Sequence, residues 1–143
     1  MLDAYRDLID ELLETPTEIR ALIARVDEGE ITSEVRRSLA EMRDRDLLVL
    51  ERARAMTAKD HAYLQDIVVG EETNEREVET LLGELEAARG DLVSLLINLS
   101  LKDWERTAFH EIRGELTLAE EIEEHVDYDE SQRGRLRALL ERS

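Results

Sequence analysis

Cysteine is absent from the sequence, and proline, glycine and aromatic residues are scarce. Without a thiol, the chain cannot form a disulfide, a thiolate zinc site, an iron–sulfur cluster or a cysteine nucleophile. One proline and six glycines among 143 residues leave few positions that interrupt a helix. The abundant Leu, Glu, Ala and Arg favour helix. We therefore expect a single all-α domain over residues 1–143, without a β-sheet.

Long apolar runs are also missing, and we expect no signal peptide. The apolar stretch LVSLLINLSL is shorter than the ~20 residues that a membrane-spanning helix needs. The first residues, MLDAYRDLIDE, are acidic and amphipathic and lack the basic and apolar regions of a secretory signal. The sequence predicts a cytoplasmic protein that does not enter a membrane.

Basic residues are few compared with acidic ones: the chain has 19 basic and 36 acidic residues, and its formal net charge is −17. A surface of this sign is repelled by nucleic-acid backbones and by anionic lipid headgroups. We expect no nucleic-acid partner and no membrane partner.

Apolar residues at helical spacing are the main feature that the sequence does contain. They predict four long helices, over about 2–26, 34–57, 75–99 and 117–140. In the second helix we expect Leu47 on the buried side and a solvated face for the charge-rich segment RDRDLLVLERARA. Thr15 followed by Pro16 makes the first helix either one kinked helix or two nearly collinear ones.

Polar residues at the helix starts predict their N-caps. Ser33 is expected to cap the second helix, and Thr73 or Asn74 the third. Thr117 and Glu120 have the spacing of a capping box. Four helices with two longer connections, 58–73 and 100–116, indicate a four-helix bundle. The long connection 58–73 suggests that the second and third helices run parallel.

The second connection and the last helix hold the less ordinary residues. We expect Trp104 and Phe109 to close one end of the bundle, and Gly114 to have a positive φ. In the last helix, a polar group interrupts the apolar stripe; it consists of His125, Tyr128, Asp129 and Gln132. A polar break of this kind indicates a site, or the remains of one.

Several motifs in this order resemble those of the DinB-like/YfiT-like family. The segment LAEMRDRD, at 39–46, is similar to a motif of the family's second helix. Towards the end of the chain, the matching residues are Asp103, Trp104, Arg106, His110, Gly114, Thr117, Leu118, Asp129, Arg133 and Gly134, while Arg135 replaces a Gln. The resemblance implies a four-helix bundle, often a homodimer, with nickel or zinc on three histidines. Some relatives are thiol-dependent transferases or isomerases.

The three histidines implied by the resemblance are missing from this chain. Their positions fall on Glu41, Tyr128 and Gln132. A phenol with a pKa near 10 and an amide oxygen are poor substitutes for imidazole as ligands of late first-row metals. We therefore expect a degenerate metal site and no cofactor.

Three interpretations of this region stay open. Glu41, Tyr128 and Gln132 can form a hydrogen-bonded polar layer, with the Tyr128 hydroxyl donating to Glu41. They can line an altered acid–base or small-molecule pocket. A displaced nickel or zinc site can instead use Glu41, Asp44, His125 and Asp129, because His125 and Asp129 are one helical turn apart.

The remaining histidines favour structural interpretations, with His110 bonding the backbone of its connection and His61 exposed. The chain has no P-loop, no dinucleotide-binding motif, no H-E-x-x-H and no G-x-S-x-G. The favoured function is a non-catalytic binding or structural module, acting as a homodimer on a small molecule or a protein. The alternative is a metal-dependent transferase or hydrolase of the DinB/YfiT type with a rearranged ligand set.

Overall fold

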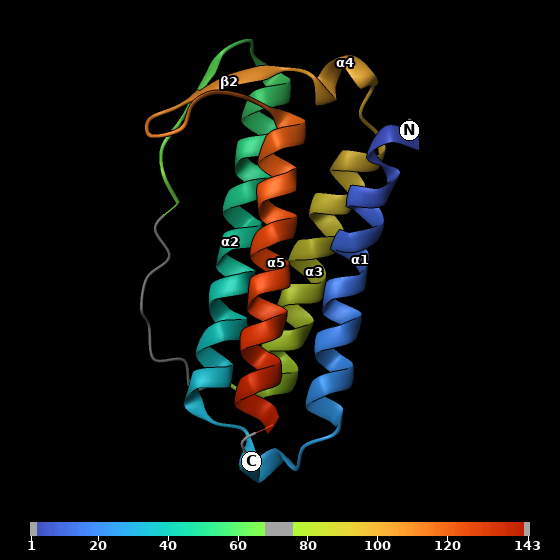
Figure 1. Cartoon of the computed structure of the whole chain (residues 1–143), viewed down its shortest axis with the longest axis vertical. Helices are drawn as coiled ribbons and strands as arrows, with labels where there is room; N and C mark the ends of the chain where they lie inside the picture. Colours follow the sequence, from blue (N-terminus) through green and yellow to red (C-terminus); the bar gives the residue numbers. More distant parts are fainter. Residues whose placement is uncertain (1–2, 68–75, 142–143) are drawn as a thin grey trace.

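The computed structural model of the chain describes residues 3–67 and 76–141, and four long helices lie within these ranges. They are α1 (Asp3–Ala24), α2 (Ser33–Ala58), α3 (Val78–Ile97) and α5 (Leu118–Glu141). Helices α1 and α2 each pack against α3 and α5. The consecutive helices α1 and α2 therefore lie diagonally opposite each other in the four-helix bundle (Figure 1).

Helices α2 and α3 run in the same direction, as the length of their connection predicts (Figure 1). Both end at the same end of the bundle, where α2 leads into a short strand and α3 into a second connection. Helices α1 and α5 run in the opposite direction (Figure 1). The long crossover connection is thus a consequence of placing two consecutive helices parallel.

The expectation of a chain without a β-sheet is wrong, because a three-stranded sheet covers this end of the bundle. Its strands are β1 (Ala62–Leu64), β2 (Thr107–His110) and β3 (Gly114–Thr117), in the order β1-β2-β3. Strand β2 pairs parallel to β1 and antiparallel to β3. Strands of three or four residues are too short to give a period-two pattern that stands out beside the helices.

The helix ends agree with the sequence at some caps and differ at others. The capping box at the start of α5 is confirmed, because the Glu120 N–H donates to the Thr117 hydroxyl at 3.1 Å and the Thr117 N–H donates to the Glu120 carboxylate at 3.0 Å. Thr32, rather than Ser33, caps α2. Helix α3 begins at Val78, and Thr73 and Asn74 lie outside the described residues. Helix α1 is continuous through Pro16.

The smaller elements place the aromatic residues. Besides the 3₁₀ turn η1 (Glu28–Glu30), there is a one-turn helix α4 (Leu101–Trp104) with its own capping box. Trp104 is buried and stacks on Tyr5 with 4.6 Å between ring centroids, so it closes the bundle end as predicted. Phe109 does not, because it lies on the outer face of the sheet and is exposed. Gly114 has the predicted positive φ, of 77°.

The buried apolar residues form two clusters, one at each end of the bundle. The cluster near the sheet includes Leu12, Val49, Leu92 and Ile122, and the other includes Leu39, Met42, Leu85 and Leu136. Charged and polar side chains separate the two clusters. Among the described residues, no helix has the length and apolar character needed to cross a membrane.

Candidate functional site

A buried arginine, Arg89 of α3, lies between the two apolar clusters. Its guanidinium donates to Asp46 of α2, from Nε to Oδ2 at 2.8 Å and from Nη2 to Oδ1 at 2.9 Å. It also donates to Asp129 of α5, from Nη1 to Oδ2 at 2.7 Å and from Nη2 to Oδ1 at 2.9 Å. All three side chains are buried. Two carboxylates with paired bonds to one guanidinium give a strong and directional arrangement.

His125 of α5 is part of the same group, which we call the central layer (Asp46, Arg89, His125 and Asp129). Its Nδ1 accepts a hydrogen bond from Arg45 Nε at 3.3 Å, so the ring proton is on Nε2. His125 Nε2 then donates to Asp46 Oδ1 at 2.6 Å. With a neutral imidazole, the charges of Arg45 and Arg89 balance those of the two aspartates.

Helix α1 contributes a backbone carbonyl to the central layer. Pro16 has no N–H, so the carbonyl oxygen of Leu12, four residues earlier, lacks its usual helical partner. Arg89 Nη1 donates to this oxygen at 2.7 Å. The proline in mid-helix and the buried arginine therefore complement each other. Through this bond, all four long helices meet in the central layer.

Burial and hydrogen bonding oppose each other in setting the pKa values of the layer. Burial alone raises the pKa of Asp46, but the hydrogen bonds from His125 and Arg89 outweigh it, so the pKa lies below its usual value. For Arg89, burial lowers the pKa, and the bonds to Asp46 and Asp129 reverse this and raise it. Within the central layer, the bonded pair Asp46 and Arg89 therefore favour each other's ionised form.

The three positions implied for the missing histidines lie on the facing sides of α2 and α5, which we call the seam (Glu41, Tyr128 and Gln132). Gln132 Oε1 accepts from the Ser38 hydroxyl at 2.9 Å. A Glu41 carboxylate oxygen is 3.7 Å from Arg135 Nη1. The expected Tyr128–Glu41 hydrogen bond is not among the contacts of the described residues.

Tyr128 is instead covered by a cation. The guanidinium carbon of Arg45 is 4.3 Å from the centroid of the Tyr128 ring. Burial raises the pKa of the Tyr128 phenol to about 12, and the charge of Arg45 opposes that rise. A phenol with this pKa stays protonated at neutral pH, and a fixed positive charge lies against its ring.

The residues of the displaced metal site are not brought together. Asp44 bonds Arg43 at 3.0 Å and is partly exposed, whereas His125 and Asp129 are buried in the central layer. It is Asp46, two residues after Asp44, that meets His125. Within residues 3–67 and 76–141, no three His, Cys, Asp or Glu side chains are grouped so that they could hold a metal ion.

A second set of charged side chains joins the bundle to the sheet. Arg52 of α2 donates to Glu121 of α5 at 2.5 Å and to the backbone oxygen of Gln65. His110 Nδ1 accepts the N–H groups of Ile112 and Arg113, both at 3.1 Å, which is the structural role predicted for this histidine.

Arg106, of the same family motif, is also held by local bonds. Its side chain pairs with Asp60 and Asp103, each at 3.3 Å, and its carbonyl accepts the Leu118 N–H at 3.0 Å. Arg106 therefore ties the one-turn helix α4 to the start of α5.

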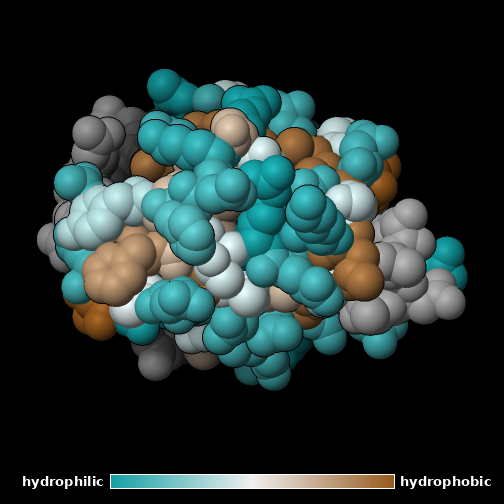
Figure 2. Space-filling view, turned by 90° about the horizontal axis from the view of Figure 1, so that it is seen from above, coloured by the Kyte–Doolittle hydropathy of each residue, from teal (hydrophilic) through white to brown (hydrophobic). Residues whose placement is uncertain are grey.

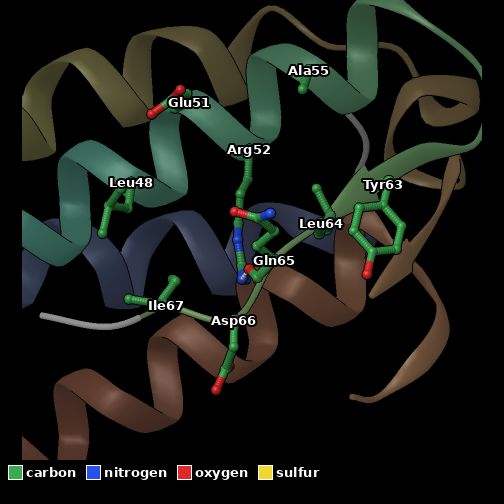
Figure 3. Close-up of a pocket in the computed structure, with 9 residues that line it drawn as sticks. All are labelled: Leu48, Glu51, Arg52, Ala55, Tyr63, Leu64, Gln65, Asp66 and Ile67. Carbon is green, nitrogen blue, oxygen red and sulfur yellow. Dashed lines mark hydrogen bonds between the residues drawn. The ribbon is translucent and has the colours of Figure 1, made fainter. Parts of the chain in front are cut away.

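A hollow with a volume of about 590 Å³ lies between α2 and the segment that follows β1. Figure 3 shows Arg52 reaching across it from α2 to Gln65. Its apolar wall comes from Leu48, Ala55, Leu64 and Ile67, with Tyr63 at one side. Since Arg52 is bonded to Glu121 and Gln65, the hollow offers a ligand mainly apolar surface and carboxylates.

Asp46 and Arg89 were not recognised as site residues from the sequence, although a signal was present. Arg89 lies four residues after Leu85 and three before Leu92, in the middle of an apolar stripe. Asp46 has the same relation to Met42 and Val49. The expected solvated face of segment 43–55 is therefore wrong at Asp46, which is buried, and Leu47, expected inside, is exposed. A charged residue at a position of an apolar helical stripe indicates a buried charge, and both Arg89 and Asp46 stand at such positions.

Comparison with known proteins supports the fold. No protein-family model matches the chain, and no curated protein does. Among solved structures, YfiT from Bacillus subtilis, a probable metal-dependent hydrolase with an unusual four-helix bundle topology, matches with a TM-score of 0.83 at 14% identity. The match covers 99% of this chain and 89% of that one. The chain therefore has the YfiT fold, as the sequence motifs predict.

Proposed function

We propose that this chain is a non-catalytic binding module that uses the YfiT-like bundle without a metal ion. The observation that carries this proposal is the seam. Where the resemblance implies three imidazoles, Gln132 bonds Ser38, Glu41 faces Arg135, and Tyr128 lies under the guanidinium of Arg45. A protonated phenol, an amide oxygen and one carboxylate beside a fixed cation do not suit nickel or zinc.

The alternative, a metal-dependent transferase or hydrolase with rearranged ligands, requires the central layer to be taken apart. His125 would have to release Asp46, and Asp129 would have to release Arg89. Both exchanges remove hydrogen bonds from a buried charge, because Asp46 would keep only its bonds from Arg89, and Arg89 would lose one of its two carboxylate partners. The donors available to a metal therefore do not fit one, and we derive no chemical step through it.

Acid–base or nucleophilic catalysis without a metal is also poorly supported by the side chains. His110 and His125 use their ring nitrogens in structural bonds. On the surface, His61 Nδ1 is 3.4 Å from the Thr107 hydroxyl, but the neighbouring Asp60 pairs with Arg106. An activated nucleophile needs a base that a third group orients, and no such group contacts His61 within residues 3–67 and 76–141.

Metal analysis of protein purified without a histidine tag or chelating resin tests the proposal. We expect substoichiometric nickel and zinc in the purified protein. Added nickel or zinc should leave the midpoint of thermal unfolding unchanged, because only a ligand that binds the folded state stabilises it. Tightly bound metal at one equivalent per chain would contradict the proposal and favour the hydrolase alternative.

A further inference from the structure

The outer face of the sheet carries exposed aromatic side chains in a chain that has few. Tyr63 of β1 and Phe109 of β2 are in register, and their rings stack with 6.2 Å between centroids. Tyr63 is 61% exposed and Phe109, the only Phe of the chain, is 52% exposed. Ile112, in the turn after β2, is 70% exposed. We call these three residues the aromatic face.

The aromatic face continues into the hollow beside α2. Tyr63 belongs to both, since its ring stacks on Phe109 and also lines the hollow with Leu48, Ala55 and Ile67. Binding energy at protein interfaces concentrates on a few anchoring side chains that fill a desolvated pocket, and the hollow beside Tyr63 offers such a pocket. Seen from above, this end of the bundle is mostly hydrophilic with separate apolar patches (Figure 2).

The charges next to the aromatic face include a glutamate that forms no ion pair with another described residue. Glu115 of β3 is the cross-strand partner of Phe109, is exposed, and has no ion-pair partner among residues 3–67 and 76–141. The nearby cation Arg113 is bonded to Glu121 and Glu124. A second copy of this chain, with its own net charge of −17, is repelled from such a surface. A basic partner is attracted to it.

We propose that the aromatic face and the adjoining hollow bind a basic segment of a partner protein that carries an apolar or aromatic anchor. The anchor side chain enters the hollow next to Tyr63. Lysine or arginine side chains lie against the rings of Tyr63 and Phe109 and pair with Glu115. This inference rests on the proposed role as a binding module and names the chemistry of its partner.

A displayed library of random twelve-residue peptides tests the inference without presupposing a sequence. We expect the selected peptides to contain lysine or arginine together with leucine or an aromatic residue. Fluorescence anisotropy then measures the Kd of one labelled selected peptide. Phe109→Ser and Tyr63→Ser should each weaken binding by about tenfold. Leu13→Ser, at a half-exposed leucine of α1, is the matched control and should leave the Kd unchanged.

Charge reversal separates a local effect from the general attraction of an acidic protein for cations. Glu115→Lys should weaken binding severalfold, whereas Glu30→Lys, in η1 at the opposite end of the bundle, should not. All variants are checked by thermal unfolding. Ile112→Ser, in a turn, replaces either strand variant that fails to fold.

Three results would overturn the inference. The selected peptides are acidic or uncharged, the Phe109→Ser and Leu13→Ser variants bind them equally, or sedimentation shows a dimer that Phe109→Ser dissolves. The last result would assign the aromatic face to a second copy. None of these bears on metal content, so the failure of this inference and that of the metal-free proposal are distinguishable.

Discussion

The central layer and the seam are both polar, lie between the same helices α2 and α5, and differ in how their groups are paired. In the central layer, Arg89 makes two bonds to each of two aspartates and a fifth to a backbone carbonyl. In the seam, Gln132 has one hydrogen bond, and the Glu41–Arg135 contact is 3.7 Å long. The first is sealed in the core, and the second is half-buried.

The difference shows which polar residues the fold depends on. A buried charge without a partner is far more costly than an exposed one, so each member of the central layer depends on the others. Water can replace a lost partner at the seam, where Glu41, Tyr128 and Gln132 are only partly buried. We therefore expect substitutions to be severe in the central layer and mild at the seam.

The largest effect is expected from Arg89→Leu. It removes the cation that bonds the buried Asp46 and Asp129, and the free energy of unfolding should fall by about 3–5 kcal/mol. Chemical denaturation measures the change. The matched control is Arg20→Leu, because Arg20 pairs with Glu79 and Glu86 on the surface. Its cost should be about 0–1 kcal/mol. Equal costs for the two variants would remove the distinction between sealed and exposed pairs.

Asp46→Asn should have the next largest effect, and that effect should depend on pH. It weakens charge-assisted bonds and should cost about 1.5–3 kcal/mol at neutral pH. The pKa of Asp46 is lower in the folded state than in the unfolded chain. Its contribution is therefore complete above about pH 4 and is lost as the pH falls through the lower, folded value.

Unfolding free energies of the native protein and of Asp46→Asn, measured from pH 7 downwards, check this dependence. The difference between the two should shrink below about pH 4. The control Asp44→Asn concerns a partly exposed aspartate two residues away. A difference for Asp46→Asn that stays constant with pH would show that folding does not lower the pKa of Asp46.

Pro16→Ala probes the bond between helix α1 and the central layer. In an ordinary helix interior, replacing proline by alanine stabilises the helix by about 3 kcal/mol. Here α1 is continuous through Pro16, and Arg89 already satisfies the Leu12 carbonyl. We expect Pro16→Ala to raise the free energy of unfolding by less than about 1 kcal/mol, because the restored N–H competes with Arg89 for the Leu12 carbonyl oxygen. A gain near the full value in denaturant unfolding would mean that the Arg89–Leu12 bond contributes little.

The smallest effects belong to the seam. Gln132→Ala removes the acceptor of Ser38 and should cost about 0.5–1.5 kcal/mol. Tyr128→Phe keeps the ring that lies under Arg45 and should change stability by less than about 0.5 kcal/mol. Thermal and denaturant unfolding measure both. A loss of several kcal/mol in either variant would make the seam as essential as the central layer.

The sequence predicts what is local and leaves out what joins distant residues. The four helices follow from apolar spacing, and the Thr117–Glu120 capping box follows from residues three apart. The strands escape prediction because they are short and pair across large separations in the chain. Arg89 and Asp46 are 43 residues apart, and among 36 acidic and 19 basic side chains the sequence does not say which ones meet.

The same limit applies to the candidate site. The sequence places Glu41, Tyr128 and Gln132 on helices α2 and α5, and the structure brings those helices side by side. The contacts made there by Ser38 and Arg45 depend on the register of α2 against α5, which no local pattern encodes. The aromatic face could likewise not be predicted without the sheet, because only the strand assignment places the Phe109 side chain on the outer face of the sheet.

The most direct test of the account is a titration with nickel of the native protein beside the triple variant Glu41→His, Tyr128→His, Gln132→His. The variant places three imidazoles on the facing sides of α2 and α5 and leaves further coordination positions to water. We expect no binding by the native protein in isothermal titration calorimetry, and one equivalent bound orders of magnitude more tightly by the variant. Tight binding by the native protein, or equal affinities for the two, would contradict a bundle that works without a metal.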